Sequence, residues 1–443
     1  MVNSNHYIAY SLQLVKLFAF LSVSMILISC ATYSQYAHSL RDGLVAGNPE
    51  ASLAIAEKHD PEQKEVVDSL EKGMLRRMNN DYSGSNQIFE VAKQEIEKLY
   101  GISVTENLAS VTINDTLRGY EGDRFEQLLL HAYMAMNYIQ LGQLDEARVE
   151  MLQANVKMME WGEAPEEDAF LRYLEGIIYE NLKENDNALI SYRKAYAVYK
   201  ERGGRQYPVA PLVLKKDLLR LLSIEGLSSE LKSTRKEFAL SSYKPVKPDK
   251  HFGEVIIIIN NGLAPIKSEA VIPIFSTEVE QNLRVAFPVY RDRKGVLYAP
   301  DIRVNNKNFE VEEVEDVDAL ARYALEQQMP AIMARATARA VVKYNAQQTP
   351  ESGSLASLLL TVTNMVTERA DTRSWTTLPQ EIQLQRIRLP VGEHQLSIQM
   401  KNVAGRSVDV MNEKVMIKPK QSSFVIKHWN APKVRLTTQS LVK

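Results

Sequence analysis

A repeated spacing of small and large residues between positions 73 and 195 restricts the fold of this chain more than any other feature of its sequence. Each copy starts at a small residue, and fixed intervals then bring an aromatic position, a turn, a second small residue, a large residue and a third small residue. Small residues allow two helix backbones to approach where they cross, so the spacing predicts antiparallel helix pairs. The positions are Gly73, Ser85, Phe89 and Ala92 in the first copy, Ala135, Tyr138, Gly142, Ala147 and Ala154 in the second, and Gly176, Tyr179, Ala188, Tyr192 and Ala195 in the third.

The pattern resembles the tetratricopeptide (TPR) repeat. Arg76 stands in the first copy where the other two have an aromatic residue. The copies are separated by 62 and 41 residues, against roughly 34 in that repeat, which implies insertions near 101–124 and 161–168. Because stacking of at least three pairs is usual, we expect further helices at 35–60 and at 213–238, with a turn near Gly226.

The first 29 residues have a different character. Leu17–Ile28 form an uncharged apolar run of 12 residues after Lys16. This is the length of the hydrophobic core of a signal peptide, and it is shorter than the roughly 20 residues of a transmembrane helix. The run ends in Leu27, Ile28, Ser29 and Cys30, which resemble the lipobox of bacterial lipoproteins.

That resemblance implies cleavage before Cys30 and acylation of its thiol and of the new amine. Ala31 follows the cysteine, where Asp would favour retention at the inner membrane. We therefore expect a lipid anchor at Cys30 in the outer membrane, with the chain facing the periplasm. An ordinary secretory peptide or an uncleaved anchor is the alternative.

Composition and motifs exclude several kinds of site. Among 443 residues there are 53 Lys+Arg and 55 Asp+Glu, so the chain has no basic field and nucleic acid is not an expected partner. A single cysteine cannot form an internal disulfide or a CxxC zinc site. The sequence has no glycine-rich nucleotide loop, no HExxH and no GxSxG motif. We expect no metal, no cofactor, no catalytic residue and therefore no enzyme.

Residues 241–443 show a different periodicity. The segment 241–252, with two prolines and three lysines, is typical of a linker. Short apolar or alternating runs then predict strands at 253–259, 271–275, 284–290, 296–304, 394–400, 408–411, 414–417 and 423–428. Residues 317–346 predict a long helix in which Pro330 is a kink or a break. The apolar run 355–366 is expected to pack in the core, with an oligomer contact or a membrane surface as alternatives.

The expected fold class is therefore multidomain, with an all-α TPR-like helical repeat domain followed by an α+β domain. The second domain has an antiparallel β framework with a helical insert. The expected boundaries are 1–29 for the signal peptide, 30–240 for the helical repeats, 241–252 for the linker and 253–443 for the α+β domain, with the insert at 316–370.

Several short motifs in the second half are distinctive: residues 253–255, 261–267 (NGLAPIK), 287–290 (FPVY), and 370–375 (ADTRSW) with Leu378 and Pro379. They are similar to motifs of a family of functionally uncharacterised Gram-negative envelope lipoproteins with N-terminal TPR-like helices. Members tend to be encoded near a lipoprotein that activates a penicillin-binding protein. The resemblance implies work in the cell envelope, with peptidoglycan-synthesis machinery among the candidate partners, and assigns no reaction.

Asp371, Arg373 and Trp375 lie two residues apart in the last of these motifs. One interpretation is a loop that binds a polar ligand or glycan. The other is structural: an Asp–Arg pair holds the junction before the next strand while Trp375 covers the core.

From these features we expect a lipid-anchored periplasmic adaptor or scaffold that mediates protein–protein interactions with envelope proteins. The alternatives are a subunit of an envelope secretion or export complex and a glycan- or peptidoglycan-binding protein.

Overall fold

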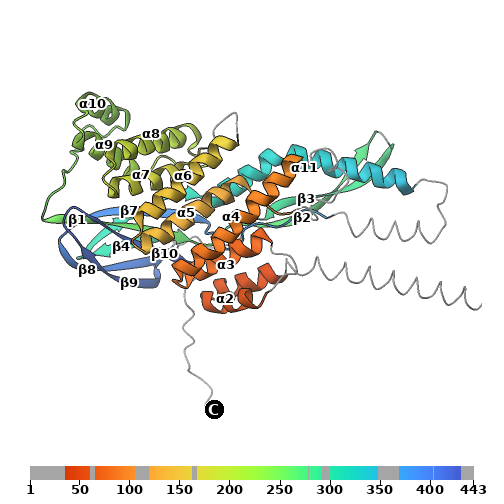
Figure 1. Ribbon diagram of the computed structural model, residues 1–443, viewed down its shortest axis with the longest axis horizontal. Coiled ribbons are helices and arrows are strands. Elements are labelled where there is room, and N and C mark those ends of the chain that lie inside the picture. The colour runs from red at the N-terminus through yellow and green to blue at the C-terminus, as the bar shows by residue number, and fades with distance from the viewer. Residues whose placement is uncertain are drawn as a thin grey trace, which may run out of the picture.

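The computed structural model describes residues 35–59, 65–105, 119–161, 167–277, 279–291, 299–347, 369–402 and 404–430. Helices dominate the part before residue 240, and strands dominate the part after residue 252 (Figure 1). The predicted signal peptide, Leu27, Ile28, Ser29 and Cys30 lie outside the described residues, as does the apolar run 355–366.

Five helix pairs follow one another in the described N-terminal part. The three pairs that the repeat predicts are present, and so are the expected pairs on both flanks. They are the helix over 35–45 with α2 (Pro49–Lys58), α3 (Val66–Met78) with α4 (Tyr82–Thr105), α5 (Arg124–Gln140) with α6 (Leu144–Glu160), α7 (Ala169–Asn181) with α8 (Asn185–Arg202), and α9 (Leu212–Ile224) with α10 (Ser228–Glu237).

All five pairs turn in the same way. The turn residue adopts a left-handed conformation, with φ between 64° and 74°. The N–H of the next residue donates to the carbonyl five positions earlier over 2.8–3.0 Å. This is the Schellman arrangement that closes the end of a helix. The turn residues are Gly47, Asn80, Gly142, Lys183 and Gly226.

The small and large positions of the repeat meet within one pair. A Cβ atom added to Gly73 would lie 2.3 Å from the ring of Phe89, and one added to Gly176 would lie 2.4 Å from the ring of Tyr192. The large residue therefore packs on the first small residue of its own pair.

A serine hydroxyl marks the same helix crossing in two pairs. Ser85 Oγ donates to the carbonyl of Gly73 over 2.7 Å, and Ser52 Oγ donates to that of Leu40 over 2.6 Å. The helices of the first pair thus cross at the equivalent position, although Leu40 stands where the other pairs have a small residue.

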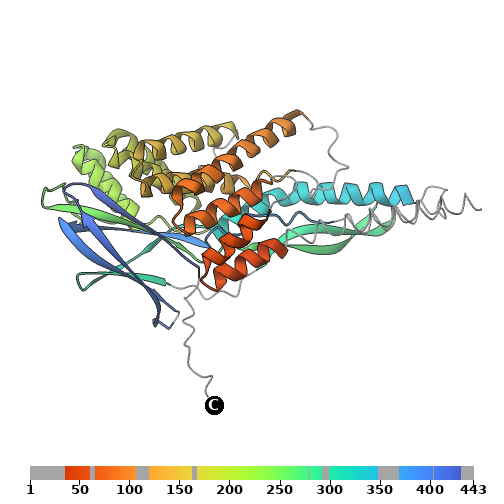
Figure 2. The same cartoon turned by 60° about the horizontal axis from the view of Figure 1, so that its bottom comes forward.

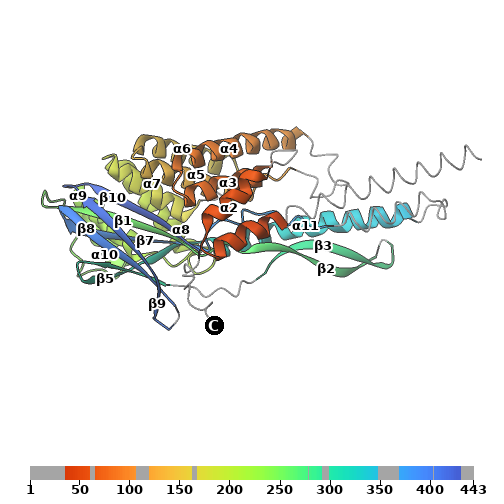
Figure 3. The same cartoon turned by 90° about the horizontal axis from the view of Figure 1, so that it is seen from below.

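The C-terminal strands form two four-stranded sheets. The first has the order β10 (Ser422–Trp429), β1 (Phe252–Asn261), β7 (Glu381–Pro390), β6 (Glu312–Asp316), and the second the order β5 (Lys307–Glu310), β4 (Ala299–Val304), β8 (Gly392–Lys401), β9 (Ser407–Ile417). One face of β1 packs against the second sheet through Val255, Ile257 and Ile259, while Ile256 and Ile258 belong to the core shared with the helices. The molecule therefore has three layers, with the helices on the first sheet and the second sheet behind it (Figures 2 and 3).

Three expectations for this half need correction. The framework is not entirely antiparallel, because the chain leaves the second sheet after β9 and its next strand, β10, pairs parallel to β1 in the first sheet. The two strands expected at 408–411 and 414–417 form one strand, β9, since Asn412 and Glu413 remain paired with β8. Strands β5, β6 and β7 were not expected as separate elements.

An arm extends from this body. It consists of α11 (Val317–Gln347) lying on the hairpin of β2 (Ile266–Ser276) and β3 (Gln281–Arg291) (Figures 1 and 3). Leu283, Val285, Ala336 and Ala340 form its small core. Pro330 lies inside one continuous helix, so it is not a break between two helices.

The two halves share one hydrophobic core. It contains Tyr133 of α5, Ile256 of β1 and Trp375 in one continuous cluster. The segment from residue 239 to 251 contains neither helix nor strand. The predicted linker falls there, and its status as a domain boundary stays a prediction.

Candidate protein-interaction site

The inner face of the helical array, where TPR arrays usually bind peptides, is covered by the protein's own C-terminal half. Tyr133 of α5 donates to Asn260 of β1 over 2.9 Å, and Tyr199 of α8 donates to the carbonyl of Val314 in β6 over 2.6 Å. Glu312 of β6 accepts the backbone N–H groups of Leu212 and Val213, which lie at the start of α9. A partner peptide would have to displace the first sheet to reach this face.

The segment 371–378 runs between helices and sheet, where two buried glutamates bind its backbone. Glu71 of α3 accepts the N–H of Thr376 over 2.7 Å and that of Thr377 over 3.1 Å. Glu126 of α5 accepts the N–H of Trp375 over 2.8 Å. Burial raises the pKa of Glu126 to about 7, and the charge of Asp123 adds to this effect.

Asp371, Arg373 and Trp375 have the structural role that was one of their two interpretations. Arg373 forms a two-pronged pair with Asp371 at 3.0 and 2.8 Å and lies 5.4 Å from the centre of the Tyr120 ring. Trp375 is 1% exposed and contacts the rings of Phe89 and Tyr133 edge-on. The fold thus uses all three side chains at the junction between its halves.

Replacing Arg373 with Ala is expected to lower the melting temperature, because Asp371 loses its partner and Tyr120 its cover. For a pair that is partly exposed, the cost is about 1 kcal/mol. Thermal unfolding followed by circular dichroism checks this, with Arg373→Lys as the charge-preserving control. Unchanged melting would return the motif to the ligand-binding interpretation.

The motifs that resemble the envelope lipoprotein family converge on the start of α5. Lys267 of the NGLAPIK motif donates to Asp123 over 2.9 Å and lies 5.7 Å from the centre of the Tyr290 ring of the FPVY motif. Gln328 of α11 donates to the other oxygen of Asp123. Segments far apart in sequence therefore meet where the helices, the sheet and the arm join.

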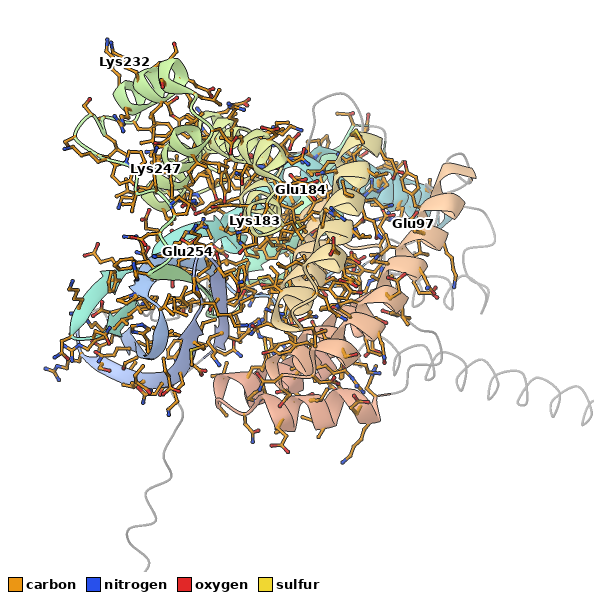
Figure 4. The ribbon with its side chains drawn as sticks, turned by 60° about the vertical axis from the view of Figure 1, so that its left-hand side comes forward. Glu97, Lys183, Glu184, Lys232, Lys247 and Glu254 are labelled. Carbon is orange, nitrogen blue, oxygen red and sulfur yellow. The ribbon has the colours of Figure 1, made fainter. Side chains whose placement is uncertain are left out.

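A second buried polar cluster surrounds Arg386 of β7. Its guanidinium contacts Glu180 of α7 and Asp217 of α9 at 3.0 Å each, and Glu254 of β1 at 2.7 and 2.8 Å. Figure 4 shows Glu254 between the sheet and the helices. Arg386 lowers the pKa of both Glu180 and Glu254, against the effect of their burial. This cluster ties two helix pairs to the sheet.

Polar side chains on α5 and α7, the first helices of their pairs, are likewise occupied or packed. His131 contacts Glu150 at 2.9 Å and Arg172 contacts Glu167 and Glu175, all largely buried. Tyr179 is buried and Tyr138 partly buried, as expected of repeat-core residues.

The outer face of α6 carries the clearest unexplained surface feature. Val149, Leu152, Val156 and Met159 are 45%, 47%, 47% and 72% exposed. Their spacing of three, four and three residues places them on one side of the helix. Ala147, Met151, Ala154 and Met158 on the other side are buried in the array. Sequence reasoning missed this row because the spacing does not reveal which apolar face of a helix is covered.

A cavity of about 960 Å³ lies between the helices and the arm. Aromatic and charged side chains line it, including Trp161, Tyr207 and Arg124. Lys267, Asp123 and Gln328 also line it, and they are bonded to one another. Its polar wall is thus part of the junction between the halves.

Glu315 of β6 is fully buried near Asp168, the residue that caps α7. Neither Glu315 oxygen has a hydrogen-bond partner of normal geometry in the described part of the chain, although the backbone N–H of Phe170 faces the carboxyl group. Burial raises the pKa of Glu315 well above its ordinary value and that of Asp168 to about 6. The protonated form of Glu315 is therefore the one that the fold accommodates.

Replacing Glu315 with Gln is expected to stabilise the protein at pH 8 by about 1–3 kcal/mol. A carboxyl whose pKa is raised by folding contributes stability below its unfolded pKa and loses it as the pH rises through the folded value. The gain should therefore shrink toward pH 4. Urea unfolding at both pH values measures it, with the exposed Glu146→Gln as control. A gain independent of pH would contradict this assignment.

Within the described residues, no helix is both long and apolar enough to cross a membrane, and no group of three or more His, Cys, Asp or Glu side chains is arranged to hold a metal ion. The predicted lipidation residue Cys30 lies outside those residues, so the anchor stays a prediction.

No family model and no curated protein matches this sequence. Among solved structures, MamA residues 41 to the end from Desulfovibrio magneticus RS-1 is 13% identical, with a TM-score of 0.30, over 47% of this chain and 92% of that one. MamA of MSR-1 is 12% identical, with a TM-score of 0.29, over 47% and 94%. TM-scores this low do not establish a shared fold, so the repeat assignment rests on the helix pairs themselves.

Proposed function

We propose that this protein is a non-catalytic scaffold for protein–protein interactions, anchored through lipid at Cys30 in the outer membrane and facing the periplasm. The observation that carries the proposal is the exposed apolar row on α6, since a contiguous apolar surface on a soluble body is typical of an interaction site. The buried charged clusters around Glu71, Glu126 and Arg386 join the halves, which favours a structural use of them.

The proposed anchor is supported by the lipobox-like residues Leu27, Ile28, Ser29 and Cys30. Envelope proteins, including peptidoglycan-synthesis machinery, are the partner class that the family resemblance favours. A helical array whose inner face is closed and whose outer face is open suits a scaffold that binds on its outer side.

Site-specific photo-crosslinking in the cells that produce the protein tests this function. A photoreactive residue at position 152 or 156 is expected to capture envelope proteins. The same residue at Lys232, which is exposed on α10 and far from α6 in Figure 4, is the control. Capture of no envelope protein from 152 and 156 would overturn the scaffold.

The anchor has its own test. Replacing Cys30 with Ala is expected to abolish incorporation of radiolabelled palmitate and membrane fractionation of the processed chain. Continued palmitate labelling of the variant would contradict lipidation at this residue.

A further inference from the structure

The row on α6 has the spacing of a coiled-coil seam. Val149, Leu152, Val156 and Met159 occupy successive a and d positions, which span about 15 Å at 1.5 Å per residue. A helix in a soluble array normally presents polar residues on its outer side. The buried residues of α6 already hold it in the array, so the row is not needed for the helix to pack.

Carboxylates border this row on the side that faces α4. Glu146 lies three residues before Val149 and Glu160 lies four residues after Val156, and both are exposed. Glu97 of α4 is 56% exposed and is labelled on that helix in Figure 4. Between α4 and α6, Lys93 and Lys157 are recessed, with 13% and 15% of their side chains exposed. Two more cations lie nearby: Lys98, 65% exposed, pairs with Glu95, and Arg148, 34% exposed, pairs with Asp145 and Glu184. Carboxylates therefore outnumber cations around the row.

We propose that this row is the docking site for an amphipathic helix of a partner protein whose apolar face is bordered by Lys or Arg. This inference rests on the proposed scaffold function and names the chemistry of its partner. An apolar a/d seam accepts a second helix by packing side chains between its own. The acidic border selects a basic flank, because opposite charges across an interface favour the encounter and like charges disfavour it.

A second copy of this chain fits less well. If two α6 helices met antiparallel about the middle of the row, Val149 would oppose Met159 and Leu152 would oppose Val156 of the other copy. Glu146 of one copy would then lie within two positions of the site opposite Glu160 of the other, at both ends of the row, which brings like charges close. Arg148, which would lie opposite Glu160, already pairs with Asp145 and Glu184 of its own chain. A basic partner helix has no such conflict.

Two synthetic helical peptides of about 18 residues test the inference. Both carry Leu at a and d positions, and one has Lys and the other Glu at the flanking positions. Binding to the full-length chain in a non-ionic detergent is measured by fluorescence anisotropy. The Lys peptide is expected to bind at least about tenfold more tightly than the Glu peptide, which is a difference of about 1.4 kcal/mol.

Two sets of variants locate the binding. Leu152→Asp with Val156→Asp is expected to weaken binding of the Lys peptide about tenfold or more, whereas Lys232→Asp leaves it unchanged. Glu146→Lys with Glu160→Lys should reduce or reverse the preference between the peptides. All four sites are exposed, so circular dichroism should show unchanged melting and thus exclude unfolding as the cause.

The alternatives give distinct results. Equal binding of the two peptides, or binding that survives the Asp variants, would overturn the inference. Concentration-dependent dimerisation lost in Leu152→Asp would overturn it in favour of a second copy. If crosslinks from position 152 in cells reach envelope proteins but neither peptide binds, the docking chemistry fails and the scaffold function stands. If position 152 captures no envelope protein in cells and neither peptide binds, the scaffold function is contradicted as well.

Discussion

Replacing Trp375 with Ala is expected to lower the free energy of unfolding by about 3–5 kcal/mol. The side chain is buried between the helices and the sheet and contacts the rings of Phe89 and Tyr133 at centroid distances of 5.6 and 5.9 Å. Its indole N–H donates to Thr377 over 3.0 Å. Truncation removes the apolar contacts and leaves a cavity at the junction of the halves.

Denaturant unfolding measures this loss. Trp375→Phe keeps most of the volume and should cost less than the alanine variant, because only the outer ring and the N–H bond are lost. Trp161→Ala is the matched control, since Trp161 is only partly buried at the end of α6. A similar small loss for both alanine variants would contradict the central position of Trp375.

Replacing Arg386 with Met is expected to cost about 3–5 kcal/mol at neutral pH, because Glu180, Asp217 and Glu254 lose the cation that they share. Arg220 still contacts Glu180 and Asp217, but not Glu254 in the described contacts. Uncompensated carboxylates in a buried site are the main source of the loss. The substitution also removes the ion pairs that join α7 and α9 to β7.

The loss should depend on pH. Arg386 holds the pKa of Glu180 and Glu254 below the ordinary value, so their contribution is present above the unfolded pKa and disappears as the pH falls through the folded one. The difference between wild type and Arg386→Met should therefore narrow toward pH 3. Arg388→Met on the same strand is the control, because Arg388 is partly exposed and its ion pair with Asp249 is 3.9 Å long. Equal losses for the two variants would argue against the shared cluster.

The helix pairs were largely predictable from local spacing. The turns at Asn80, Gly142 and Lys183 lie where the repeat places them, and all share one backbone conformation. The first pair escaped the pattern because Leu40 occupies its small position, although Ser52 makes the same hydrogen bond as Ser85. A pattern based on residue size cannot detect a crossing that a serine hydroxyl marks.

The strands were less predictable. β1 reads as a continuous apolar run because it is buried on both faces, so it shows no alternation. β6 and β7 carry buried charged residues, Glu315 and Arg386, at positions where strand patterns expect apolar ones. The carboxylates that bind Arg386, those of Glu180, Asp217 and Glu254, lie 206, 169 and 132 positions earlier in the chain, so no local window contains them.

For the motif at 371–375, spacing left two interpretations open. The contacts support the structural one, and ligand binding stays a prediction. Glu71 lies 305 residues before Thr376 in sequence, and Glu126 lies 249 residues before Trp375. Only the folded chain brings these carboxylates to the backbone of the motif. A short-range Asp–Arg spacing is equally compatible with binding a ligand and with binding the protein itself.

Local spacing was thus enough to predict the helix pairs and their turns. The lipobox-like segment that ends at Cys30 stays a prediction. Periodicity specifies which side chains of a helix face the same way, but not what covers them. Both sides of α6 are apolar in the sequence, and only tertiary packing buries Met151 and Met158 while leaving Leu152 and Val156 open. The first sheet, assembled from residues 252 to 429, closes the inner side of the array, and for this reason the open surface of the protein is the outer one.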